Sequence, residues 1–192
     1  MTVTTLDNAT EPILIDGLTW QEFKTIERLL DRPGIRLSFL GGTLEIRTMP
    51  GRKHETAKQR ISNLLDIFLE VSDIDYTPTG SMTLESEAGQ VKREADLSYE
   101  LTSDRERPDL AIEVVVTSGG IDKLEAYNRL KIPEVWFWQN GRLLIYALHQ
   151  QEYEAIAQSE LLPELDLMLL VRCINLPNHI QAVREFRQGI QG

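Results

Sequence analysis

The apolar segment from Leu110 to Val116 is interrupted by one charged residue, Glu113. Near-continuous apolar runs of this length are typical of strands buried inside a sheet, so we expect a strand over Asp109 to Thr117. An ionised carboxylate inside such a strand is costly unless it is paired, hydrogen-bonded or bound to a metal. The alternative is an edge strand whose Glu113 faces solvent.

The segments that follow this strand predict how its sheet is built. The pattern indicates a helix over 121–131 and then a second strand from Val135 to Gln139. A strand, a helix and a further strand in this order favour a parallel, right-handed crossover. Asn140-Gly141 then predicts a hairpin into a strand over 142–148.

Local signals predict the other elements of an α/β domain. Thr19 and Glu22 form a capping box ahead of apolar residues at helical spacing, and Gly41-Gly42 marks the turn of a hairpin. The remaining expected elements are a helix from Trp20 to Pro33-Gly34, strands over 35–40 and 43–48, a helix over about 54–71, a short strand near 81–84, a strand over 93–101, strands near 153–156 and 168–171, and a C-terminal helix over about 178–189.

Composition narrows the class of protein. The chain has 192 residues, a formal net charge of −10 and one cysteine, Cys173. This length favours a single domain, and one cysteine excludes an internal disulfide framework and a cysteine-rich zinc site. We found no signal peptide and no apolar run long enough to cross a membrane, so we expect a cytoplasmic protein.

Asp96 is the expected partner of Glu113. If the loop over 102–107 is centred between Asp104 and Arg105, Asp96 lies opposite Glu113 and both carboxylates share one face of the sheet. Two like charges at this distance call for a cation between them. Hard oxygen ligands without a cluster of imidazoles or thiolates indicate Mg²⁺ or Mn²⁺ rather than zinc.

Three further residues are candidates for the same site. Lys123 lies in the first turn of the helix after Glu113, where it could orient a water or neutralise a phosphoryl group, or simply face solvent. His54 shares the apolar face of its helix, which is also typical of a packing residue. Glu45 alternates with apolar neighbours in its strand, which is also typical of a solvent-facing side chain.

The charge is unevenly distributed. Residues 47–60 contain five basic residues and one acid, Glu55, in a chain that is acidic overall. The net charge argues against a protein that coats nucleic acid with its whole surface, whereas this segment allows a local contact with DNA of modest affinity. The aromatic run Trp136 to Trp138 fits either the core or the interface of a homodimer.

Several short motifs resemble those of one known family: Glu94-Ala95-Asp96, Pro108-Asp109-Leu110-Ala111-Ile112-Glu113-Val114, Thr117-Ser118-Gly119-Gly120, Lys123-Leu124-x-x-Tyr127, Ile132-Pro133-Glu134-Val135-Trp136 and, less specifically, Gly42-x-Leu44-Glu45 with His54-Glu55. Two carboxylates on successive strands and a lysine resemble the PD-(D/E)XK nuclease superfamily. More narrowly, residues 15–175 resemble the Uma-two family, restriction-endonuclease-like proteins that are numerous in cyanobacteria.

The resemblance implies a restriction-endonuclease-like fold, a mixed β-sheet core flanked by helices, in a single domain over residues 1–192. It also implies that Asp96, Glu113 and the backbone carbonyl of Val114 bind a divalent metal. The sequence departs from the superfamily at Val115, where a lysine is expected, and in this family that role passes to the position of Lys123. Ala95 replaces a proline, which matters little chemically.

The leading hypothesis is a Mg²⁺-dependent or Mn²⁺-dependent endonuclease that hydrolyses phosphodiester bonds of DNA. In it Asp96 and Glu113 hold the metal, Lys123 helps to position the attacking water, and Glu45 and His54 assist. One alternative is a catalytically inactive module of the same fold that binds a protein partner. The other is a metal-dependent hydrolase of a small phosphorylated substrate.

Overall fold

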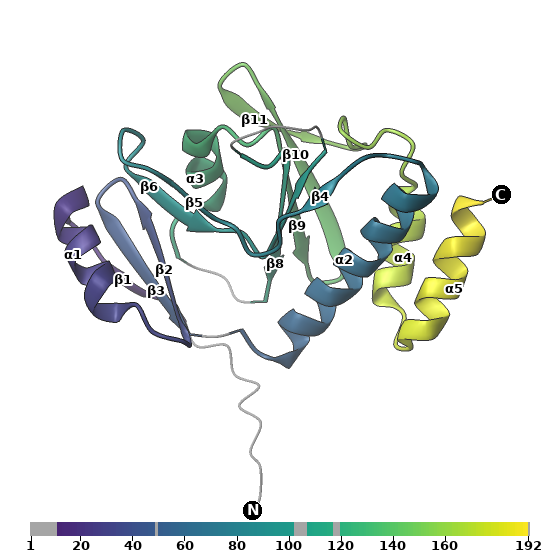
Figure 1. The fold of residues 1–192 in the computed structure, drawn as a ribbon, viewed down its shortest axis with the longest axis horizontal. Helices are drawn as coiled ribbons and strands as arrows, with labels where there is room; N and C mark the ends of the chain where they lie inside the picture. The colour runs from purple at the N-terminus through teal and green to yellow at the C-terminus, as the bar shows by residue number, and fades with distance from the viewer. Residues whose placement is uncertain (1–10, 49, 102–106, 117–119, 192) are drawn as a thin grey trace, which may run out of the picture.

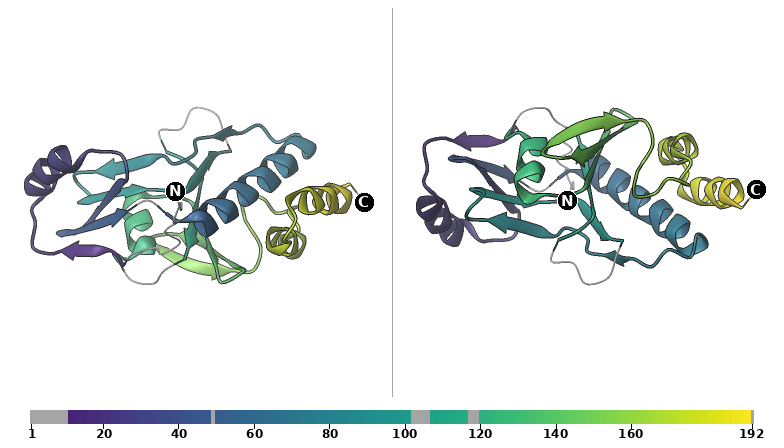
Figure 2. Two further views of the ribbon diagram at one scale, coloured as in Figure 1. Left: turned by 90° about the horizontal axis from the view of Figure 1, so that it is seen from below. Right: turned by 90° about the horizontal axis from the view of Figure 1, so that it is seen from above.

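The computed structural model describes residues 11–48, 50–101, 107–116 and 120–191. Their strands form two sheets, which we call the N-terminal sheet and the central sheet. Helix α1 (Trp20–Leu30) lies at one end of the molecule, and helices α2 (Arg52–Val71), α4 (Leu167–Asn175) and α5 (His179–Ile190) lie at the other (Figures 1 and 2). The expected mixed α/β fold is therefore confirmed, but its strands are divided between two sheets.

The N-terminal sheet has five antiparallel strands. Their order across the sheet is β1 (Ile13–Ile15), β3 (Thr43–Thr48), β2 (Ile35–Leu40), β6 (Val91–Glu94) and β5 (Thr83–Ser86). The predicted hairpin is confirmed, and both glycines of its turn have positive φ. The capping box of α1 is also confirmed. Trp20 and Phe23 of that helix are buried, whereas the apolar Leu29 is 77% exposed.

The central sheet has six strands. Their order is β11 (Glu152–Ile156), β10 (Arg142–His149), β9 (Glu134–Gln139), β8 (Leu110–Val115), β7 (Leu97–Glu100) and β4 (Thr77–Pro78). The pair β8 and β9 is parallel and is connected through helix α3 (Lys123–Leu130), as the sequence predicts. All other pairs are antiparallel. Strand β8, which contains Glu113, is therefore an inner strand and not an edge.

Helices cover both faces of the central sheet. One face packs with α2, α4 and α5 into the largest core, whose floor includes Trp136 and Trp138. On the other face α3 lies between the two sheets, where Tyr127 and Leu130 pack against Val91 of β6. Trp136, Phe137 and Trp138 are all buried, so the aromatic run belongs to the core.

Two predicted strands have a different structure. The strand expected over 93–101 is interrupted at Ala95 and Asp96, where the chain leaves β6 of one sheet and enters β7 of the other. The segment expected as a strand over 168–171 is part of helix α4. Asp166 caps this helix through the backbone N–H of Leu169, and its apolar residues face the core at helical spacing.

The expected loop over 102–107 and the Thr117-Ser118-Gly119 part of the motif lie largely outside the described residues. Within the described residues, none of the helices is both long enough and apolar enough to span a bilayer.

Candidate active site

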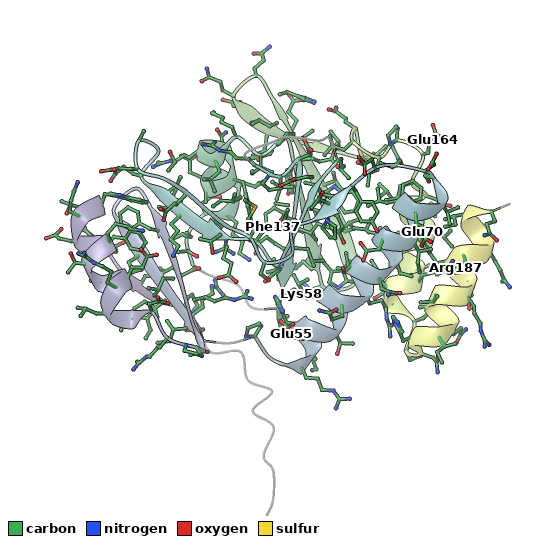
Figure 3. All side chains as sticks on the ribbon, in the orientation of Figure 1. Glu55, Lys58, Glu70, Phe137, Glu164 and Arg187 are labelled. Carbon is green, nitrogen blue, oxygen red and sulfur yellow. The ribbon has the colours of Figure 1, made fainter. Side chains whose placement is uncertain are left out.

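A cavity of about 80 Å³ lies where the two sheets meet the first turns of α2 and α3. It receives side chains from β2, β3 and β6 on one side and from β8 on the other, so neither sheet forms it alone. Figure 3 shows the densely packed side chains of this region beside the start of α2, which its labels Glu55 and Lys58 mark. The charged and titratable residues that line the cavity are Arg36, Arg47, His54, Arg93, Glu94, Asp96, Glu113 and Lys123.

Glu113 is 1% exposed and accepts four hydrogen bonds. Arg93 binds both of its oxygens through one edge of the guanidinium, with Nε 3.0 Å from Oε1 and Nη2 2.8 Å from Oε2. Lys123 Nζ lies 2.7 Å from Oε2, and the Tyr127 hydroxyl lies 2.5 Å from Oε1. These donors use all of the roughly four lone-pair positions of a carboxylate. Burial opposes ionisation, but Arg93 and Lys123 hold the pKa of Glu113 well below its usual value.

Asp96 lies at the point where the chain crosses between the sheets. The β7–β8 register pairs Leu97 with Ile112, and continuing it by one residue places Asp96 opposite Glu113, as the loop geometry predicts. One oxygen accepts from Arg36 Nη1 at 2.9 Å. The other lies 2.9 Å from His54 Nε2 and 2.8 Å from the backbone N of Val114. Burial opposes ionisation of Asp96, but the contact with His54 keeps its pKa below the usual value.

Glu45 does not face solvent, since it is 1% exposed. Its oxygens lie 2.9 Å from Arg47 Nε and 3.2 Å from Arg93 Nη1. It also accepts a hydrogen bond of 3.0 Å from the backbone N of Ile121. Arg93 therefore joins a carboxylate of the N-terminal sheet to Glu113 of the central sheet. The contact at Ile121 fixes the backbone two residues before Lys123.

His54 and Lys123 both reach the carboxylates. His54 is buried on the sheet-facing side of α2, and its second ring nitrogen lies 3.1 Å from Glu55 Oε1. Lys123 is the first residue of α3, directly after the N-cap Asp122. The structure thus brings four of the five candidate side chains to one cavity, and Glu45 lies behind its lining, where Arg93 links it to Glu113.

Sequence reasoning did not identify the arginines of this site. Arg36, Arg47 and Arg93 come from three strands of the N-terminal sheet. Arg36 contacts Asp96, Arg47 contacts Glu45, and Arg93 contacts both Glu45 and Glu113. A signal was available for Arg93, because alternation places it on the same face as the buried Val91. The arginines on β2 and β3 carry no comparable signal, since their pairing depends on how the two sheets meet.

The chemistry of the two carboxylates fits a hard divalent cation, because both present oxygen ligands to the same cavity. In the described part of the chain, no three His, Cys, Asp or Glu side chains form a group that could hold a metal ion. Asp96 accepts three hydrogen bonds and keeps one lone-pair position, whereas Glu113 has none left. A cation bound to Glu113 would therefore displace a donor, and Lys123 is the partner whose side chain is most exposed.

Comparisons with known proteins show the fold and the family of this chain. The solved structure of "a putative nuclease belonging to DUF820" from Anabaena variabilis ATCC 29413 is similar to this chain, with a TM-score of 0.55 and 15% sequence identity. The similarity covers 88% of this chain and 99% of the other, and at 15% identity it shows the fold alone. No curated protein matches the chain. A family model described as "Uma2: Putative restriction endonuclease" matches residues 20–177. The chain therefore belongs to the Uma2 family.

Proposed function

We propose that this protein hydrolyses phosphodiester bonds of DNA at the cavity between its two sheets, with Mg²⁺ or Mn²⁺ as cofactor. Membership of the Uma2 family supports a nuclease-like function. The observation that carries the proposal is the meeting of Asp96, Glu113 and Lys123 at one cavity, with Lys123 Nζ 2.7 Å from a Glu113 oxygen.

Asp96, Glu113 and the backbone carbonyl of Val114 are the proposed ligands of the cation. When bound, a divalent cation supplies a Lewis acid for the phosphate and lowers the pKa of a bound water. The low pKa values of both carboxylates keep them ionised at neutral pH, which is the state that binds a cation.

The protein's own side chains have separate roles in this proposal. Lys123 exchanges its contact with Glu113 for one with the substrate phosphate, where its ammonium stabilises the charge that develops during cleavage. His54 orients Asp96 through the 2.9 Å contact at Nε2. Glu45 is a positioning residue, because it holds the backbone N of Ile121 and so fixes the start of the helix that carries Lys123.

Plasmid cleavage in the presence of Mg²⁺ or Mn²⁺ tests this function. Asp96→Asn keeps the shape of the side chain but removes its charge, and we expect it to reduce the cleavage rate by at least about 100-fold. Asp75→Asn removes the same charge from an exposed position and is the matched control. A chelator should abolish cleavage by the wild type. Equal cleavage by wild type and Asp96→Asn would contradict the assignment.

One observation favours a second candidate function. Glu113 already has four protein donors, which is what a purely structural ion-pair network requires. The second candidate is therefore a catalytically inactive module that binds a protein partner. Calorimetric titration with Mn²⁺ separates the two, because the enzyme binds the ion at millimolar concentration or below and the module does not. A homodimer and a single domain over the whole chain stay predictions.

A further inference from the structure

A second hollow, of about 540 Å³, lies beside the candidate active site, and we call it the basic groove. Its walls are the first turns of α2, the end of β9 and the end of α4. Its lining includes Arg52, Lys53, Thr56 and Arg60 of α2 and Trp138 of β9. Among the residues that the structure describes, three cations and no acid line the groove, although the chain carries ten more acidic than basic side chains.

Arg60 is a buried cation with incomplete compensation. It is 8% exposed, and its Nη1 donates to the backbone carbonyls of Ile174 and Leu176. Its buried Nε has no hydrogen-bond partner in the described part of the chain. These carbonyls lie at the end of α4, which offers only about half a negative charge. Within the described residues no carboxylate forms an ion pair with Arg60. A buried charge of this kind favours an anion in the adjoining groove.

The first turn of α2 adds further positive potential. Arg52 and Lys53 lie there, where the helix dipole disfavours cations, and neither forms an ion pair with the described residues. The N-cap, Gly51, has no side chain to accept the free N–H groups of this 20-residue helix. Thr56 is exposed in the next turn and adds a hydroxyl. The groove therefore gathers charged and neutral donors that suit phosphate oxygens.

The groove adjoins the catalytic cavity. Val114 lines the cavity and Trp138 lines the groove, and these two residues are partners in the paired strands β8 and β9. Paired strands lie only about 4.8 Å apart. On α2, His54 faces the cavity while the neighbouring Lys53 faces the groove. A polymer of phosphates that occupies the cavity can therefore continue into the groove, whose described lining residues include no acid.

We propose that the basic groove binds the phosphodiester backbone of DNA next to the bond that is cut. The position relative to the scissile bond rests on the proposed function, whereas the binding of DNA phosphates by the groove does not. Arg52 and Lys53 make the outer phosphate contacts, and Arg60 supplies the buried charge at the floor.

Fluorescence anisotropy with a labelled DNA duplex, measured in the presence of a chelator, tests the groove without cleavage. Each phosphate contact contributes about 0.9 to the slope of log affinity against log salt concentration. The exposed double variant Arg52→Ala/Lys53→Ala should therefore lower the slope by about 1.8 and weaken binding at low salt. Arg184→Ala/Arg187→Ala removes the same charge from the exposed surface of α5 and should leave the slope unchanged (Figure 3 labels Arg187).

The outcomes separate the groove from the proposed function. An unchanged slope in Arg52→Ala/Lys53→Ala, or an equal decrease in the α5 control, overturns the groove even if the wild type cleaves DNA. A decrease confined to the groove variant supports it, even if the wild type fails to cleave and the proposed function is wrong. Thermal unfolding monitored by circular dichroism verifies that both double variants keep the fold intact.

Discussion

Arg93→Met removes the cation that joins the two sheets. Arg93 is 5% exposed and makes four hydrogen bonds: two to Glu113, one of 3.1 Å to Ser38 and one of 3.2 Å to Glu45. Methionine fills much of the same volume but offers no donor. Two carboxylates would then remain buried with fewer partners, while the shape of the core changes little.

The loss in the free energy of unfolding depends on the carboxylates that remain buried without Arg93. Removing one partner of a buried ion pair typically costs about 3–5 kcal/mol. Glu113 keeps Lys123 and Tyr127, and Glu45 keeps Arg47, so we expect the lower end of this range, about 3 kcal/mol. Domains of this kind are stable by about 5–15 kcal/mol, so the variant should still fold at room temperature but with a clearly reduced melting temperature.

The stability difference between the wild type and Arg93→Met depends on pH. In the wild type the pKa of Glu113 lies well below its usual 4.5, so the carboxylate stabilises the fold above about pH 4.5, and this contribution is lost as the pH falls further. In Arg93→Met the effect of burial is less opposed, and the pKa of Glu113 rises. Acidification therefore removes less stability from the variant than from the wild type, and the difference in free energy of unfolding narrows towards about pH 4.

Urea denaturation near neutral pH and near pH 4 measures both effects. Arg142→Met removes an exposed arginine from β10 and should change the free energy of unfolding by less than about 0.5 kcal/mol. The double variant Arg93→Met/Glu113→Gln should recover part of the loss, because one buried charge disappears with its partner. A loss below about 1 kcal/mol, or a loss that is the same at both pH values, would refute the reasoning.

Two further substitutions test the surroundings of the site. Gly120→Ala should lower the melting temperature, because φ is +100° and the new Cβ would lie 1.9 Å from Glu45 Oε2. The control is Gly80→Ala, which has φ of +61° and open space around the new Cβ, so only the backbone strain of about 1–2 kcal/mol destabilises it. Glu134→Ala should cost at least about 3 kcal/mol in urea denaturation and alter the fluorescence of Trp136, because the buried carboxylate accepts from that indole, one hydroxyl and two backbone N–H groups. A decrease in the free energy of unfolding of less than about 1 kcal/mol in Gly120→Ala or in Glu134→Ala would contradict the expectation for that variant.

Much of the fold could be predicted because its signals are local. The turn at Gly41-Gly42 and the turn at Asn140-Gly141 both require positive φ, and both fix the register of the strands they connect. The capping box at Thr19 marks the start of α1. At the site, a loop centred between Asp104 and Arg105 predicts Asp96 opposite Glu113, and the β7–β8 register continued by one residue agrees with that pairing.

The rest depends on contacts between distant segments. Helix α4 has nine residues and is mostly apolar, so its periodicity is too short to distinguish a helix from a strand. The break at Ala95 and Asp96 follows no glycine or proline signal, and it exists because β6 and β7 pair with different sheets. The strand pattern around Glu45 also fits a solvent-facing side chain. Its buried position depends on Arg93, which lies 48 positions further along the chain and which a local pattern does not reveal.

The crossing at Asp96 also constrains how the sequence can change in length. Arg93 must point into the cavity from one sheet, and Asp96 must face it three residues later from the other. Because successive side chains of a strand alternate between faces, one residue inserted or deleted between β6 and β7 would turn one of the two away. The turn at residues 87–90 makes no contact with the cavity and has no such constraint. We therefore expect insertions and deletions among relatives of this chain to gather at such turns and to be excluded from the four residues 93–96.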